Sequence, residues 1–310
     1  MSKILFLFPG QGSQEVGMGR DLFQNDEYFR SLVAYGSELV EENLEKICLR
    51  GPDKKLMQAR FLQPLLSAVS LGYMRQLEAQ GIHADMVLGH SLGEITALAA
   101  AGIVDDKQAV AMAAKRGQLM DEVGSEITGA MMAVLFLPYE RVQTLLDDMN
   151  ADERLVLAND NAPEQVVVSG DVELLQLFAE KVAEQGGKTR KLCVAGPWHS
   201  PFMKKARYAF EEWAAPIKFK KPSTPIILNA TAKTEHHPTT IKHLVTWQLT
   251  SPVFFRECLQ TAQEYEFDTL VEIGPGRVLS GLARVNGLKN AKMFNVNNLR
   301  GIEKISEIGK

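Results

Sequence analysis

The sequence predicts an α/β protein, in which a parallel, helix-covered sheet carries a small inserted subdomain of the ferredoxin-like type. Short and continuously apolar segments, typical of strands buried on both faces, are separated by helical patterns in both the first and last parts of the chain. The middle part instead follows the order βαββαβ. A chain of 310 residues, 45% hydrophobic and 23% charged, is long enough to bury such a core.

Four apolar segments predict the strands of the parallel sheet. They are residues 3–8 (KILFLF), 85–88, 225–228 and 269–273 (TLVEI). The first ends in the turn PGQG, and the last ends in Gly274-Pro275-Gly276, after which a helix is expected near Arg277. Because helical patterns lie between them, these strands are expected to run parallel to one another.

The middle of the chain predicts the subdomain. Its expected elements are a strand at 131–137, a helix at 139–149, strands at 155–158 and 165–169 around the turn NDNAPE, a helix at 172–185 and a strand at 189–194. Patterns of the large domain flank this unit on both sides, so it is an insertion. We place the large domain at 1–127 and 196–310, and the subdomain at 128–195.

Charge and cysteine usage exclude several classes of protein. The net charge of -4 gives no nucleic-acid signature, and no apolar run is as long as a membrane span. The N-terminal MSKILFLFPG lacks a small-residue cleavage site and is not read as a signal peptide. Three sparse cysteines (Cys48, Cys193 and Cys258) indicate a reducing compartment, and we expect a cytoplasmic protein. His236-His237 lies in a polar stretch without further ligands, so no metal site is expected.

The segment MVLGHSLGE contains Gly89-x-Ser91-x-Gly93 between a predicted strand and a predicted helix. In such a strand-to-helix turn the serine hydroxyl is exposed and the glycines avoid clashes. The amide of Leu92 would then face the substrate from the helix N-terminus, where negative charge is favoured. A structural serine is the alternative, because glycine and serine are common residues.

A nucleophilic serine needs a base. The six histidines of the chain are His83, His90, His199, His236, His237 and His243. His90 adjoins the serine and is expected to point away from it, while His83 lies in a surface-like turn and His243 in a helix. His199, in GPWHSPF, follows the inserted unit at a domain junction, where pockets are common.

Two further residues suit acyl chemistry. The turn PGQGSQ allows the backbone amide of Gln11 to approach a ligand closely, although an ordinary strand-to-helix turn would have the same composition. Arg116 shares one helix face with Ala109, Met112 and Met120. A guanidinium on an apolar face needs an anion, either a protein carboxylate or a substrate carboxylate held by both arms of the fork.

Taken together, these motifs resemble those of malonyl-CoA:acyl-carrier-protein transacylases and the related stand-alone, trans-acting acyltransferases of polyketide synthases. The resemblance covers nearly the whole chain. It rests on FPGQGSQ at 8–14, GHSLGE at 89–94, KRGQLM at 115–120, HS at 199–200, QLTSPV at 248–253 and EIGPGRVLSGL at 272–282. It implies a large α/β-hydrolase-like domain with a ferredoxin-like insertion.

The resemblance also implies the roles of the site residues. Ser91 is the nucleophile and His199 the base, the amides of Gln11 and Leu92 form the oxyanion hole, Arg116 binds the malonyl carboxylate, and the backbone of Gln248 orients the histidine. The expected reaction transfers malonyl from coenzyme A, through an acyl-serine, to the phosphopantetheine thiol of an acyl carrier protein. It needs no cofactor beyond the coenzyme A thioester that is its substrate.

One position departs from the family pattern. Relatives commonly have phenylalanine before the histidine when they use malonyl and serine when they use methylmalonyl, whereas this chain has Trp198. A large ring there should narrow the acyl pocket against a branched substrate. The alternative is that Trp198 only packs the domain junction.

Two other functions compete with transfer. The first is an editing acyl hydrolase on the same fold, although relatives of that kind tend to lack the arginine at 116. The second is a non-enzymatic subunit that docks carrier proteins, which the presence of Ser91, His199 and Arg116 disfavours. The pathway, fatty acid or polyketide synthesis, stays open at this point.

The expected partner is an acidic acyl carrier protein, and the chain is expected to act as a monomer, with no nucleic-acid or membrane partner. Five basic residues are candidates for the docking contacts: Lys188, Arg190, Lys204, Lys205 and Arg207. The alternative for each is an ordinary solvated surface charge.

Overall fold

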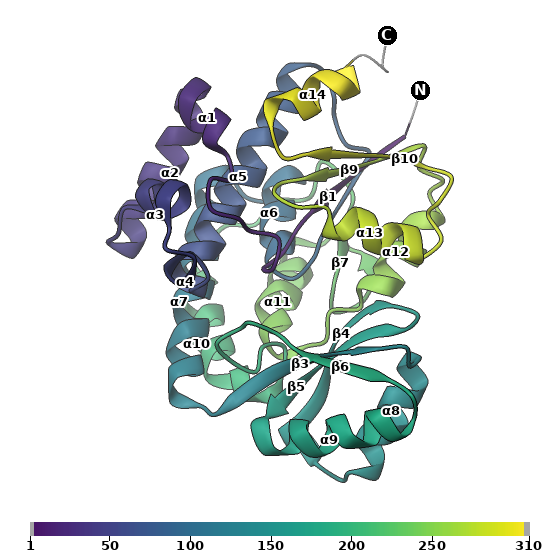
Figure 1. Cartoon of the computed structure of the whole chain (residues 1–310). Helices are drawn as coiled ribbons and strands as arrows, with labels where there is room; N and C mark the ends of the chain where they lie inside the picture. The colour runs from purple at the N-terminus through teal and green to yellow at the C-terminus, as the bar shows by residue number, and fades with distance from the viewer. Residues whose placement is uncertain (1–2, 307–310) are drawn as a thin grey trace.

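The computed structural model describes residues 3–306 and contains, within them, two β-sheets (Figure 1). The larger sheet has the strand order β10 (Lys292–Val296), β9 (Thr269–Ile273), β1 (Ile4–Phe8), β2 (Met86–Gly89), β7 (Ile226–Leu228) and β8 (Lys233–Thr234). All of its pairings are parallel except that of β7 with β8. The predicted α/β class is therefore confirmed.

Helices cover both faces of the larger sheet. Those before the smaller sheet are α1 (Arg20–Asn25), α2 (Glu27–Val40), α3 (Leu44–Arg50), α4 (Asp53–Leu56), α5 (Ala59–Ala79), α6 (Leu92–Ala100) and α7 (Asp106–Glu126). Those after it are α10 (Lys204–Ala214), α11 (Pro238–Trp247), α12 (Phe255–Gln263), α13 (Val278–Val285) and α14 (Leu299–Ser306), with short 3-10 turns at Pro201–Met203 and Gln248–Thr250. No helix among the described residues is both long and apolar enough to cross a bilayer.

The central strand β1 shows how the sheet separates two cores. Phe6 and Phe8 point into the core that α5, α6 and α7 cover, whereas Leu5 and Leu7 point into the core beneath α12 and α13. All four side chains are buried. This alternation explains why residues 4–8 have no polar member, since both faces of the strand are covered.

The smaller sheet is antiparallel and lies at the bottom of Figure 1. Its strand order is β4 (Leu155–Ala162), β5 (Gln165–Asp171), β3 (Gly129–Leu135) and β6 (Lys188–Lys191). The helices α8 (Tyr139–Asp148) and α9 (Val172–Glu184) pack on one face, and a 3-10 turn spans Asp152–Arg154. The order βαββαβ is as predicted; the exact domain boundaries at 127/128 and 195/196 stay a prediction.

The predicted turn NDNAPE is wrong, because its first four residues continue strand β4 to Ala162. Asp160 N donates to Val253 O (2.9 Å), and Val253 N donates to Ala158 O (2.9 Å). The buried Asp160 carboxylate also accepts from Arg256 Nε (2.8 Å). Polar residues typical of a turn therefore form a strand here, since a distant segment of the large domain supplies their partners.

Other boundaries differ by a few residues. Strand β3 begins and ends two residues before the predicted 131–137, and β6 ends at Lys191 rather than 194, although Leu192 N still donates to Met131 O (2.9 Å). The edge strands β8 and β10 were not predicted. Strand β8 consists of two polar residues, and β10 contains Lys292 and Asn295 and is fully buried only at Val296, so both lack the continuous apolar pattern of buried strands.

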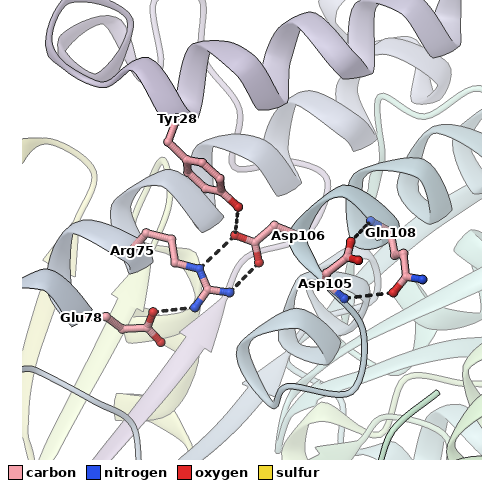
Figure 2. Close-up of polar contacts among 6 residues, drawn as sticks. All are labelled: Tyr28, Arg75, Glu78, Asp105, Asp106 and Gln108. Atoms are coloured by element: carbon pink, nitrogen blue, oxygen red, sulfur yellow. Dashed lines mark hydrogen bonds and ion pairs between the residues drawn. The ribbon is translucent and has the colours of Figure 1, made fainter. Parts of the chain in front are cut away.

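The long helix α7 is anchored at its N-terminus by polar contacts (Figure 2). Asp105 Oδ1 accepts from Gln108 N (2.7 Å), and Gln108 Oε1 accepts from Asp105 N (3.0 Å), which forms a capping box. The buried Asp106 carboxylate accepts from Arg75 Nε of α5 (2.9 Å) and Tyr28 OH of α2 (2.8 Å). These bonds fix the start of α7 against two neighbouring helices.

Candidate active site

Ser91 occupies a strained turn between β2 and α6, with φ 52° and ψ -107°. A Cβ at Gly89 would lie 2.0 Å from the Gly93 carbonyl carbon, and one at Gly93 would lie 2.0 Å from Phe8 O. Glycine is therefore required at both positions. The turn leaves the serine side chain on the surface of a cavity, as the sequence motif predicts.

The serine is paired with one histidine. Ser91 Oγ lies 2.7 Å from His199 Nε2, and His199 Nδ1 lies 2.9 Å from Gln248 O. A carbonyl oxygen can only accept, so Nδ1 carries the proton and Nε2 is free to accept from the serine hydroxyl. Burial, and after it the charge of Arg116, lowers the pKa of His199 to about 3. The imidazole is therefore neutral at neutral pH and is able to act as a base.

Arg116 is 1% exposed and extends from α7 to the serine. Its guanidinium donates to Gln63 Oε1 (2.9 Å), Gln248 Oε1 (2.9 Å) and Ser91 Oγ (3.2 Å). Within residues 3–306 it forms no ion pair, and its buried Nε has no hydrogen-bond partner. Burial lowers the pKa of Arg116 to about 10, so the group stays charged at neutral pH.

A buried polar network holds the turn and its partners together. Asn229 accepts from Ser91 N through Oδ1 (2.8 Å), and its own backbone N–H donates to Glu94 Oε2. The Gln248 amide donates to Glu94 Oε1 (2.9 Å) and Ser91 O (3.1 Å). Burial raises the pKa of Glu94 to about 8, against the opposing effects of Asn229, Arg116 and Gln248.

The sequence reasoning did not assign the other members of this network. Glu94 and Gln63 are polar residues within strongly apolar helical segments, which is a signal that could have indicated buried polar roles. Asn229 carries no such signal. It follows β7 and reaches Ser91 only because β7 pairs with β2 in the folded sheet.

Ser91, His199 and Arg116 line one cavity of about 240 Å³ together with Gln11 and Leu92. Leu92 is the first residue of α6, and Gln11 lies in the turn after β1. That turn packs directly on the serine turn, because a Cβ at Gly10 would lie 2.5 Å from His90 O. All five predicted residues are thus brought together, and the oxyanion roles of the two amides stay a prediction.

The cavity extends between the two sheets and has a largely apolar wall. Met120, Met131, Val167, Val194 and Trp198 contribute to it. Trp198 is 4% exposed, and its ring also packs on the backbones at Gly124 and Gly196, where an added Cβ would lie 2.8 Å and 2.5 Å from the ring. This tryptophan therefore contacts both the cavity and the junction of the two sheets.

The remaining histidines lie outside the reacting pair. The partly buried His90 bonds through Nε2 to Asn161 Oδ1 (2.8 Å), which turns it away from Ser91 as predicted. His83, His236 and His237 are exposed, and His243 on α11 faces Glu211. No group of three or more His, Cys, Asp or Glu among residues 3–306 is arranged to hold a metal ion.

Comparisons with known proteins agree with this geometry. The family model "Acyl transferase domain" matches residues 5–302. A curated relative, the malonyl CoA-acyl carrier protein transacylase of Bacillus subtilis (strain 168), is 37% identical over 286 residues, which cover 92% of this chain and 90% of the relative.

Solved structures agree as well. An acyl carrier protein S-malonyltransferase from Vibrio cholerae has a TM-score of 0.92 and 33% identity, with 98% of this chain and 100% of that chain covered. A malonyl-transacylase in complex with the holo acyl-carrier protein of a type II polyketide synthase has a TM-score of 0.93 and 30% identity, with 99% and 100% covered. The chain therefore belongs to the acyl transferase family.

Proposed function

We propose that this protein transfers a malonyl group from malonyl-CoA to the phosphopantetheine thiol of an acyl carrier protein, in fatty acid or polyketide biosynthesis. The observation that carries the proposal is a serine–histidine pair beside a buried arginine that has no carboxylate partner in the described part of the chain. The names of the relatives support both the acyl donor and the acceptor.

The position of the Arg116 guanidinium relative to Ser91 suits the carboxylate of a malonyl group bound to that serine. In a malonyl ester a single methylene separates the carboxylate from the ester carbonyl carbon. Arg116 donates to Ser91 Oγ from 3.2 Å, so its fork lies within reach of a carboxylate attached that closely to Ser91. A bound carboxylate would also provide the unpartnered Nε with an acceptor.

In the first half-reaction, His199 Nε2 takes the Ser91 proton while Oγ attacks the thioester carbonyl carbon. The backbone amides of Gln11 and Leu92 would hold the oxyanion; removal of one such donor typically costs about 10²–10³ in rate. The intermediate collapses, the carbon–sulfur bond breaks, and the coenzyme A thiolate leaves with the proton from His199. Malonyl-Ser91 results.

In the second half-reaction, the carrier thiol gives its proton to His199 and attacks the ester carbonyl carbon. The carbon–oxygen bond to Ser91 then breaks, and the proton returns to Oγ. Transfer requires that the carrier thiol attack malonyl-Ser91 before water hydrolyses the ester. Arg116 would favour this by fixing the malonyl group in one pose within a largely apolar cavity.

The proposal requires only one copy of the chain and no cofactor, because coenzyme A enters as part of the substrate. Ser91, His199, Arg116 and Gln248 reach one another within a single chain, so the proposed reaction can proceed in a monomer. Cys48, Cys193 and Cys258 are free thiols, which supports a reducing compartment such as the cytoplasm.

The test is intact-protein mass spectrometry after addition of malonyl-CoA, followed by a holo-acyl carrier protein. We expect a malonyl adduct on wild-type protein that moves to the carrier, and none on the Ser91→Ala variant. An adduct lost to water as quickly with the carrier as without it would instead favour the editing hydrolase. A wild-type protein that never acquires an adduct would contradict both enzymatic functions.

A further inference from the structure

Helix α13 presents an unusual outer face beside the cavity. Its exposed positions are Arg277 at the N-cap, Val278, Gly281, Arg284 and Val285, which share one side of the helix at spacings of three and four. Val278 is 49% exposed and Val285 59% exposed. The face thus combines apolar side chains with arginines and has no acidic residue, which is a composition typical of protein interfaces.

Neither arginine of this face is neutralised by a residue that the structure describes. The side chains of Arg277 and Arg284 make no ion pair or hydrogen bond with any residue in 3–306. In contrast, two of the lysines proposed from sequence as carrier contacts are already paired: Lys204 with Glu153 and Lys205 with Glu126. The net charge of the chain is -4, so free positive charge on α13 is a local feature.

Gly281 lies in the middle of this exposed face, and a Cβ there would meet nothing within 4 Å. A glycine inside a helix costs about 0.5–1 kcal/mol relative to alanine. Elsewhere in this protein such glycines are explained by close packing, as at Gly93 against Phe8 O. At position 281 no packing against residues 3–306 explains the glycine, whereas a closely approaching partner would.

The inner side of α13 is rigidly placed and borders the active site. Leu279 N and Ser280 N donate to the buried Glu272 carboxylate (3.0 and 2.8 Å), which fixes the start of the helix. Leu279 and Leu282 line the cavity that contains Ser91, and so does the exposed Val278. A partner seated on the outer face of α13 would therefore lie at the rim of that cavity.

The smaller sheet also carries free positive charge close to the cavity. Leu192 and Val194, which line the cavity, directly follow the edge strand β6. The exposed Lys188, Arg190 and Lys191 of this strand make no ion pair among the described residues. Both α13 and β6 thus attract an anionic partner.

We propose that the outer face of α13 docks the acyl carrier protein, through an acidic helix of the carrier that packs across Gly281 with its carboxylates on Arg277 and Arg284. The occupant follows from charge complementarity and from position, since the carrier must deliver a thiol into the adjoining cavity. This inference rests on the proposed function and identifies the surface through which the second substrate is recognised.

The test separates docking from chemistry by using two acceptors. The malonyl-enzyme is offered either a holo-acyl carrier protein or free pantetheine, which has the same thiol but no protein surface. We expect Arg284→Glu to lower kcat/KM for the carrier roughly tenfold or more, through KM, because like charges then face each other. Loading from malonyl-CoA and transfer to pantetheine should stay within about twofold of wild type.

Two further variants complete the experiment. Gly281→Gln adds a side chain without removing charge, and it should impair transfer to the carrier but not to pantetheine. Lys46→Glu, on α3 away from the cavity, makes the same charge change as Arg284→Glu and should leave both transfers unchanged. If Arg284→Glu and Gly281→Gln both transferred malonyl to the carrier as efficiently as the wild-type protein, the proposed docking surface would be wrong. Failure of the wild-type protein to load or to use pantetheine would instead overturn the proposed function.

Discussion

At the scale of single residues, the site depends on keeping His199 neutral and Arg116 charged in one buried space. His199 Nε2 lies 2.7 Å from Ser91 Oγ, and Arg116 donates to the same oxygen from 3.2 Å. Burial is the main reason why the pKa of His199 is low, and the guanidinium lowers it further because a protonated imidazole beside it would place two positive charges together. Arg116 thus helps to keep His199 unprotonated, and its own charge remains available to bind an anion.

The low pKa of His199 predicts an unusual pH dependence. Its value in the unfolded chain is 6.5 and in the folded chain about 3. The rate constant for loading Ser91 should therefore stay within about twofold between about pH 5 and pH 7.5, since the base is neutral throughout. The contribution of His199 to stability is full above 6.5 and is lost as the pH falls toward 3, because the unfolded state binds the proton first. Quenched-flow loading that shows an acidic limb near 6.5 would contradict the neutral histidine.

A substitution of Trp198 tests whether this side chain makes the cavity prefer malonyl over methylmalonyl. Trp198→Phe should raise the ratio of methylmalonyl to malonyl loading several-fold, because a smaller ring leaves room for a branched α-carbon, and single groups discriminate by about 1–3 kcal/mol. Competition between the two thioesters, read by intact mass, measures this ratio. Trp213→Phe on α10, outside the cavity, is the control. An equal ratio in both variants would mean that Trp198 only packs the junction of the sheets.

At the scale of elements, α7 connects a distant polar cluster to the active site. Its first turn is held by Arg75 and Tyr28 through Asp106 (Figure 2). Arg116 lies further along the same helix. The position of the guanidinium near Ser91 therefore depends on how α7 is anchored among α2 and α5.

Asp106→Asn should lower the free energy of unfolding by about 2 kcal/mol, because hydrogen bonds to a buried charged group contribute about 1.5–3 kcal/mol. Urea denaturation followed by circular dichroism measures the change. Glu78→Gln removes the half-exposed partner of the same arginine and should cost less than about 1 kcal/mol. Equal losses in the two variants would show that Asp106 is not the anchor.

The sequence predicted those strands and helices that their own residue pattern determines. Residues 4–8 and 269–273 are apolar throughout because helices cover both faces, and that pattern is visible without a structure. The extension of β4 through Asn159–Asn161 was not predictable, since its partners Val253 and Arg256 are far along the chain. The same applies to Asn229, whose contact with Ser91 exists only once β7 pairs with β2.

At the scale of the whole molecule, the cavity lies between two sheets that β4 joins. Asp160 is fully buried against Arg256, Asn161 Oδ1 bonds to His90, and Asn286 Nδ2 donates to Asn161 O (2.9 Å). These contacts connect the smaller sheet to the serine turn on one side and to the end of α13 on the other. The cavity is therefore preformed by the docking of the sheets.

Asp160→Asn should destabilise the protein by about 3 kcal/mol, because it leaves a largely buried arginine without its counter-charge. It should also slow loading of Ser91, since one wall of the cavity belongs to the smaller sheet. A thermal melt together with the loading assay measures both effects. Lys204→Gln breaks an exposed pair between the same two parts of the chain and should cost less than about 1 kcal/mol. A wild-type melting temperature for Asp160→Asn would refute this account of the junction.

The most direct test of the central claim, that buried Arg116 selects a carboxylated acyl group, is competition between malonyl-CoA and acetyl-CoA for Ser91, read by intact-protein mass spectrometry. Wild-type protein should carry mainly malonyl. In Arg116→Ala the malonyl-to-acetyl ratio should fall about 10- to 100-fold, since a hydrogen bond to a charged group contributes about 1.5–3 kcal/mol. Retained acetyl loading would show that the Ser91–His199 pair is intact in the variant. An unchanged ratio would contradict the assignment of Arg116 as the carboxylate site.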